Sequence, residues 1–267
     1  MKHFYKATFA LAICVAFLYT ACKKSGLTPA PKVADEQEVA GVVALNLEHT
    51  LAGQYGGVNI GDGVQMPSHI ASAQAKHVIN STPGSLCGFT VDTTVTYSFN
   101  QGDTIKSTVQ GKWHFVYTCT GSIPDGYKVN TSLIDIGTAP QFSFIYDIQQ
   151  NYTVQALDAQ YSKVSLNGSL KSYGDFKNAP KAFVDSNFTK TPNFQHQDYV
   201  LTNLVITVAN NFDIVSGTST FVTSGNSGFG TWTYTGTITY IGNHMAIITI
   251  NGKSYKANLI TGVVTPE

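Results

Sequence analysis

The chain has 267 residues, of which 43% are hydrophobic and 12% are charged, and its formal net charge is zero. A chain of this length and hydrophobicity can bury a large core, so disorder is not expected beyond its ends. All 16 basic residues are lysine. Because guanidinium forks for phosphate and guanine are missing, we expect no nucleic-acid partner.

The first 21 residues have the pattern of a secretory signal. A short basic region is followed by an apolar run of about fifteen residues, which ends at Ala21 directly before Cys22 and is too short to span a membrane. The segment resembles a bacterial lipoprotein signal, in which this cysteine is acylated, although Tyr19 stands where leucine is usual. We therefore expect Cys22 to be lipidated and to anchor the chain to a membrane, with ordinary secretion as the alternative.

A tether and a helix are predicted next. Residues 22–34 are polar and contain proline, which is typical of a linker. Asp35 precedes Glu38 by three positions, the spacing of a helix N-cap with its capping-box partner. Valine and leucine follow at helical spacing, so residues 36–52 should form an amphipathic helix that packs on a sheet.

A long hairpin is predicted between Cys87 and Cys119. Apolar side chains occupy the odd positions in both arms, and polar ones occupy the even positions. A hairpin centred on Asp103 would place the two cysteines opposite each other. The pattern therefore predicts a disulfide at the open end of the hairpin, with two buried free thiols as the alternative.

Further strands are predicted from period-two alternation. The strongest covers residues 141–157, as one long strand or two abutting ones. Residues 199–209 form a second, and Asn210-Asn211 predicts a turn into residues 212–222. Less regular segments predict strands at 127–137, 161–170 and 181–190, a loop at 171–181, and an irregular connection at 53–86 with a short helix near 71–77.

The C-terminal segment is predicted to be a meander. Asn251-Gly252 indicates a two-residue type I′ turn that pairs Ile248 with Tyr255. For the preceding turn we favour a three-residue loop at 241–243. A shift by one residue would place the threonines of residues 231–240 on the apolar face of the next strand.

These elements predict a mostly β domain over residues 35–267. We expect a single antiparallel sheet with long strands, either a curved sheet or an open barrel, together with one N-terminal helix.

The chain resembles a group of uncharacterised lipoproteins of Bacteroidetes-type bacteria. The likeness lies in the Cys22-Lys23-Lys24 start, in the two ends of the cysteine hairpin, and in the terminal TYTGTITYIGNHMAIITINGKSYKANL. It implies an all-β fold and a location in the cell envelope, and it offers no catalytic residues to transfer to this chain. An acidic run after the lipidated cysteine would imply surface export. Here the first acidic residue is Asp35, so the periplasmic side of the outer membrane is expected.

The same resemblance implies O-glycosylation at Asp followed by Ser or Thr and a small apolar residue or Thr. Asp103-Thr104-Ile105 and Asp92-Thr93-Thr94 fit this pattern. Thr93 has inward parity on its strand, whereas Thr104 lies at the hairpin tip. Thr104 is therefore the candidate, with a plain turn residue as the alternative.

The sequence contains no recognised catalytic, nucleotide-binding or metal-binding motif, so we expect no catalytic residues, cofactor or metal. His196 and Asp198 share one side of an extended segment, but a solvated loop before the strand at Tyr199 is the favoured interpretation. Asp62, His69 and His77 are similarly weak candidates, and His114 is expected to be exposed.

Three hypotheses about function remain. We favour a lipid-anchored, non-enzymatic envelope protein that acts as a binding or assembly module. The alternative is a carrier of lipid or another apolar ligand, which requires a cavity that the helix at 36–52 does not fill. A carbohydrate-active hydrolase or glycan-binding lipoprotein is the third, and hydrolysis would need two converging carboxylates.

Overall fold

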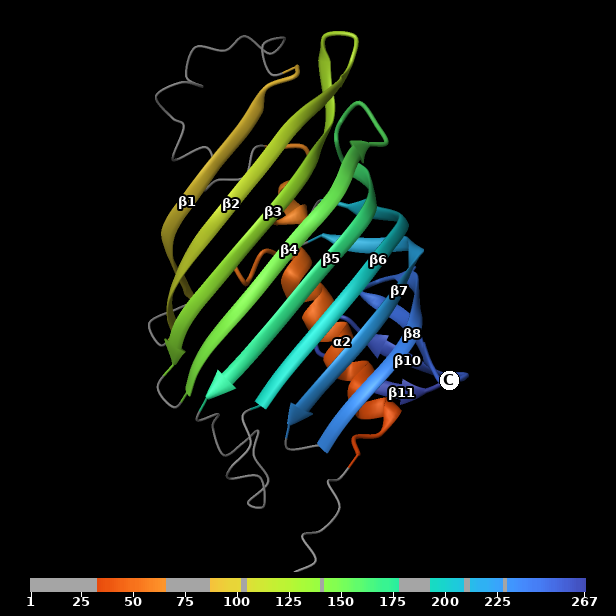
Figure 1. Ribbon diagram of the computed structural model, residues 1–267. Coiled ribbons are helices and arrows are strands. Elements are labelled where there is room, and N and C mark those ends of the chain that lie inside the picture. The colour runs from red at the N-terminus through yellow and green to blue at the C-terminus, as the bar shows by residue number, and fades with distance from the viewer. Residues whose placement is uncertain are drawn as a thin grey trace, which may run out of the picture. The chain divides into compact units, whose positions relative to one another are not determined.

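The computed structural model describes residues 33–65, 87–101, 105–139, 142–177, 193–208, 212–227 and 230–267. Residues Val33–Glu267 form one compact unit. Its described part is a single antiparallel sheet of eleven strands, not closed into a barrel, and one α-helix, α2, on one face (Figure 1). The predicted curved sheet with one N-terminal helix is confirmed.

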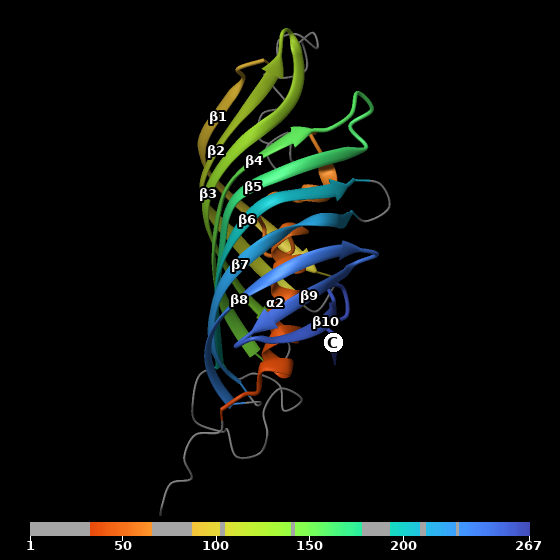
Figure 2. The same ribbon diagram turned by 90° about the vertical axis from the view of Figure 1, so that its right-hand side faces the viewer.

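Each strand pairs with its neighbours in sequence, from β1 to β11. The strands are β1 (Thr90–Gln101), β2 (Ile105–Thr120), β3 (Ile123–Ala139), β4 (Phe142–Ala156), β5 (Lys163–Lys177), β6 (Asn193–Thr207), β7 (Asp213–Ser227), β8 (Gly230–Gly242), β9 (Met245–Ile250), β10 (Lys253–Asn258) and β11 (Val264–Pro266). The long strands twist and curve together, which gives the sheet a concave and a convex face (Figure 2).

The helix α2 (Glu36–Leu51) lies on the concave face, as Figure 2 shows. Asp35 caps it by accepting a hydrogen bond from the Glu38 backbone N–H at 2.9 Å, as the capping spacing predicts. Most of its circumference is buried because the curved sheet packs against one side and the C-terminal strands β9 to β11 also contact it. Its buried side chains include small and polar residues as well as valine and leucine: Val39, Ala40, Val43, Ala44, Asn46, Leu47, Thr50 and Leu51.

The β1–β2 hairpin has the predicted register. Thr90 pairs with Val116 and Gln101 with Ile105, so the pairing is centred on position 103. Trp113 and Phe115 are fully buried on the concave face. Cys87 and Cys119 lie at disulfide-bonding distance, with their Cα atoms 5.6 Å apart.

The predicted loop at 171–181 is wrong in its first part, because Lys171–Lys177 continue β5. The inward positions there are occupied by Ser172 and Gly174, which are not apolar side chains, so the sequence shows no alternation at this point. Gly174 is required by packing, since a Cβ at this position would lie 2.5 Å from the ring of Tyr146. Residues 178–192, including the predicted edge strand, and the predicted short helix at 71–77 lie outside the described residues.

The turn predicted at 241–243 is displaced, although the apolar faces align as predicted. Ile238 pairs with Ile248 and Tyr240 with Ala246. The turn itself is Asn243-His244, both with positive φ, and the register shift between Tyr240 and Gly242 absorbs the extra residue. The following turn at Asn251-Gly252 and its pairing of Ile248 with Tyr255 are confirmed.

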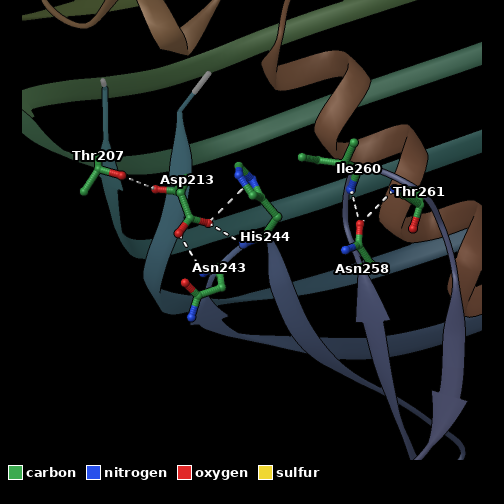
Figure 3. Close-up of polar contacts among 7 residues, drawn as sticks. All are labelled: Thr207, Asp213, Asn243, His244, Asn258, Ile260 and Thr261. Atoms are coloured by element: carbon green, nitrogen blue, oxygen red, sulfur yellow. Dashed lines mark hydrogen bonds and ion pairs between the residues drawn. The ribbon is translucent and has the colours of Figure 1, made fainter. Parts of the chain in front are cut away.

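Asp213 of β7 holds this turn from a distant part of the sequence. Figure 3 shows its carboxylate accepting hydrogen bonds from the backbone N–H groups of Asn243, at 2.7 Å, and His244, at 2.8 Å. The Leu259 N–H donates to the His244 carbonyl at 2.8 Å. These bonds hold the short C-terminal strands against the long strands of the sheet. The C-terminal strands in turn form part of the surface that contacts α2.

Replacing both Cys87 and Cys119 with serine should lower the melting temperature without preventing secretion. A crosslink that closes a loop of about 30 residues contributes roughly 3 to 4 kcal/mol to the free energy of unfolding. Calorimetry of the variant and of reduced wild type should give the same lowered melting temperature. Equal melting temperatures for oxidised wild type and variant would show that the two cysteines are not bonded.

Candidate functional site

The concave face is covered by the protein's own helix. Leu47 and Leu51 of α2 are fully buried in the same hydrophobic cluster as Trp113 and Phe115 of the sheet. The Tyr199 hydroxyl of β6 donates to the Val43 carbonyl at 3.1 Å, so polar contacts also hold the helix on the sheet. The sheet's apolar side chains are therefore used for internal packing beneath α2.

The loop after the helix covers a further part of this face. The side-chain amide of Gln150 on β4 accepts a hydrogen bond from the Val58 N–H at 2.7 Å and donates to the Val58 carbonyl at 3.3 Å. It thus pairs with the loop as a neighbouring strand would. The Tyr97 hydroxyl of β1 donates to the Gly56 carbonyl and holds the loop at a second point.

Asp135 of β3 is a carboxyl group buried on the concave face, 2% exposed. It pairs with Val109 and Tyr146 on the adjacent strands, and the Tyr55 ring of the loop stacks on Tyr146 at 4.0 Å between ring centroids. Burial raises the pKa of Asp135 to about 6, partly offset by a hydrogen bond from Ser107. Its Oδ1 has no hydrogen-bond partner among the described residues. This group is costly to ionise where it lies.

Asp135→Asn should remove a pH-dependent loss of stability. The folded pKa of about 6 lies above the ordinary 3.8, so the stabilising contribution of the protonated group is complete below about pH 4 and is lost as the pH rises through 6. The free energy of unfolding of the variant should exceed that of wild type by roughly 2 kcal/mol at pH 7.5 and by less at pH 4.5.

Urea unfolding of both proteins at the two pH values measures this difference. Asp92→Asn is the control because the Asp92 side chain is 81% exposed. A stability difference between wild type and Asp135→Asn that is the same at pH 4.5 and pH 7.5 would contradict the assignment.

The convex face carries an open hollow of about 620 Å³, which we call the polar hollow after the polar side chains that line it, although more of its exposed surface is apolar than polar. Side chains of β2 to β6 line it, and we define the hollow by its polar residues His114, Lys128, Asn130, Asn151, Asn167 and Ser169, with Val116 and Val200 beside them. The register of β5 against β6 shifts between Leu166 and Gly168, which bends the sheet here. Asn167 Oδ1 accepts from the Asn203 N–H at 2.7 Å and ties the two bent strands together.

An aromatic ridge lies on the same face, formed by Tyr173 of β5 with His196 and Phe194 of β6. The His196 ring centroid is 4.9 Å from that of Tyr173 and 5.0 Å from that of Phe194. The Tyr173 hydroxyl donates to Asp198 Oδ1 at 2.7 Å, and Lys171 Nζ lies 3.7 Å from the same oxygen. Burial and the bond to Asp198 raise the pKa of Tyr173 to about 12, so its hydroxyl remains a donor at neutral pH.

The sequence candidates fall in different places. Cys22, Thr104, His69 and His77 lie outside the described residues. Asp62 lies in a short 3-10 helix, Ile60–Asp62.

His114 is exposed, as predicted, and lines the polar hollow. His196 and Asp198 do share one side of the chain, but they lie inside β6 rather than in a loop, so the prediction of a solvated loop is wrong. Within the described ranges, no three His, Cys, Asp or Glu side chains are grouped closely enough to hold a metal ion.

Sequence reasoning missed the polar hollow and the aromatic ridge. Asn130, Asn151 and Asn167 come from three strands, and each reads alone as an ordinary outward-facing residue. The alternation of each strand does predict that these asparagines point outward. That they lie beside one another follows only once the registers of β3, β4 and β5 are known.

The chain matches no family model, no curated protein and no solved structure. The likeness to envelope lipoproteins therefore stays a prediction. Among the described residues, no helix has the length and apolar character needed to cross a membrane.

Proposed function

We propose that this protein is a lipid-anchored, non-enzymatic protein of the cell envelope that binds its ligand on the convex face of the sheet. One observation carries the proposal. The concave face is covered by α2 and the following loop, whereas the convex face keeps an open hollow of about 620 Å³ lined by polar and apolar side chains. A concave, preformed site with convergent polar groups is what small-ligand binding requires.

The alternative of an apolar carrier has less support. That function would need the concave face as a ligand cavity, but Leu47 and Leu51 of α2 pack there as part of the common core. The convex hollow is open and combines apolar surface with amide, hydroxyl and charged groups, which suits a ligand that has both polar and apolar parts.

The proposed anchor is a diacylglycerol on Cys22, at the outer membrane and on its periplasmic side. The support is the signal-like segment before Cys22 and the absence of an acidic run after it, since Lys23, Lys24 and Ser25 follow.

Cys22→Ser should move the protein from the membrane fraction to the soluble fraction. The mature wild-type protein should also carry the added mass of the lipid on Cys22, because acylation requires the thiol. Fractionation and intact-mass measurement test both statements. A wild-type protein that begins at another residue and carries no lipid would contradict the anchor.

Ligand binding in the hollow should protect Lys128 from chemical modification. Lysine acetylation is compared between native envelopes and the purified mature protein, with mass spectrometry of each lysine. Lys128 should react several-fold more slowly in envelopes. Lys256 of β10, which is exposed and outside the hollow, is the internal control.

Equal reactivity of Lys128 in envelopes and in purified protein would contradict binding at the hollow. Lipid extraction of the same purified protein separates the alternative, since a carrier would release stoichiometric apolar ligand beyond the anchor.

A further inference from the structure

We propose that the convex face binds a neutral oligosaccharide, with the polar hollow holding sugar hydroxyls and the aromatic ridge packing against a sugar ring. This inference rests on the proposed function, because it names the ligand class of the same surface.

The amide groups in the hollow are arranged for hydroxyl recognition. Asn130 pairs directly with Asn151 across β3 and β4, and Asn151 pairs with Ser169 across β4 and β5. Neither the Asn130 nor the Asn151 side chain forms a hydrogen bond within the described part of the chain, so both keep their donors and acceptor. An amide offers two donors and an acceptor, which matches the mixed donor and acceptor character of neighbouring sugar hydroxyls.

The charges of the surface argue against a strongly anionic ligand. Among the residues that line the hollow, Lys128 carries the positive charge, and His114 Nδ1 lies 3.4 Å from Asp92 Oδ2. At the ridge, Asp175 and Asp198 accompany Lys171 and His196. With both signs interspersed, the surface provides no concentrated positive field, which ligands rich in phosphate or sulfate require.

The aromatic ridge is held ready for stacking. Its three rings contact each other in a row, and the hydrogen bond from Tyr173 to Asp198 fixes one end. His196 Nε2 lies 3.9 Å from Asp175 Oδ1. The C–H face of a sugar ring can pack on these half-buried rings, while carboxylate oxygens beside them accept hydrogen bonds from its hydroxyls. The exposed Val200 offers a second apolar contact in the hollow.

The spacing of the two parts sets the size of the ligand. Ser169 in the hollow and Tyr173 in the ridge are four residues apart on β5, or about 13 Å along a strand. A single sugar cannot touch both groups, so the ligand that uses the whole surface is an oligosaccharide that runs along β5 and β6.

The test uses the mature protein and oligosaccharides released from the envelope of the producing cells, separated into neutral and acidic fractions. Titration calorimetry should show binding of the neutral fraction. Asn151→Ala in the hollow and Phe194→Ala in the ridge should each weaken binding by about tenfold or more, as expected when a hydrogen-bonding or stacking partner worth about 1.4 kcal/mol is lost. Thr96→Ala is the matched control, since Thr96 is exposed on the convex face of β1.

Thermal melting must show that the variants are folded. If Asn151→Ala does not fold, Asn151→Leu replaces it, because leucine keeps the side-chain volume without the amide. Binding only of acidic oligosaccharides, or equal binding by wild type and both variants, would overturn the proposal. If no neutral oligosaccharide binds while Lys128 stays protected in envelopes, the ligand class is wrong and the binding function stands. If Lys128 is also unprotected, both proposals fail.

Discussion

The structure depends on how an open sheet buries one face. In the described part of the chain, eleven strands in sequential order leave a concave surface of apolar side chains that no barrel closure protects. The helix α2 lies on this surface, and Leu47 and Leu51 share a core with Trp113 and Phe115. The rest of the structure therefore depends on hydrophobic burial between the helix and the sheet. Without the helix, exposed apolar surface of this extent would favour association with other chains.

Polar contacts fix the helix and its loop in one position on that surface. Asn46 of α2 donates to the Ser172 hydroxyl at 3.1 Å, and Gln150 pairs with the backbone of Val58. Asp135 is buried on the same face, and its pKa is raised to about 6. Its ionisation therefore destabilises this part of the protein at neutral pH. Because α2 and its loop occupy the concave face, the ligand site that we propose is on the convex face, where the hollow lies beside the bend in β5 and β6.

Local sequence patterns predicted the strands where the apolar period is strong and failed where it is interrupted. Alternation around Asp103 gave the hairpin register and the opposition of Cys87 and Cys119. The alternation predicts a loop at the end of β5 because Ser172 and Gly174 occupy its inward positions, where Asn46 and the Tyr146 ring are their partners. These partners are distant in sequence, and the pattern within one strand contains no information about them.

The sequence by itself determined the fold class, the capped helix, the hairpin pairing and the expectation of a signal and a lipidated Cys22. Each of these depends on period, spacing or short-range chemistry that neighbouring residues carry. The tertiary structure alone decided which face α2 covers and which outward side chains meet. Asn130, Asn151 and Asn167, and likewise Tyr173 and His196, become neighbours through strand register. Register is set by the packing of the whole sheet, because a slip of one residue would turn every apolar side chain to the wrong face.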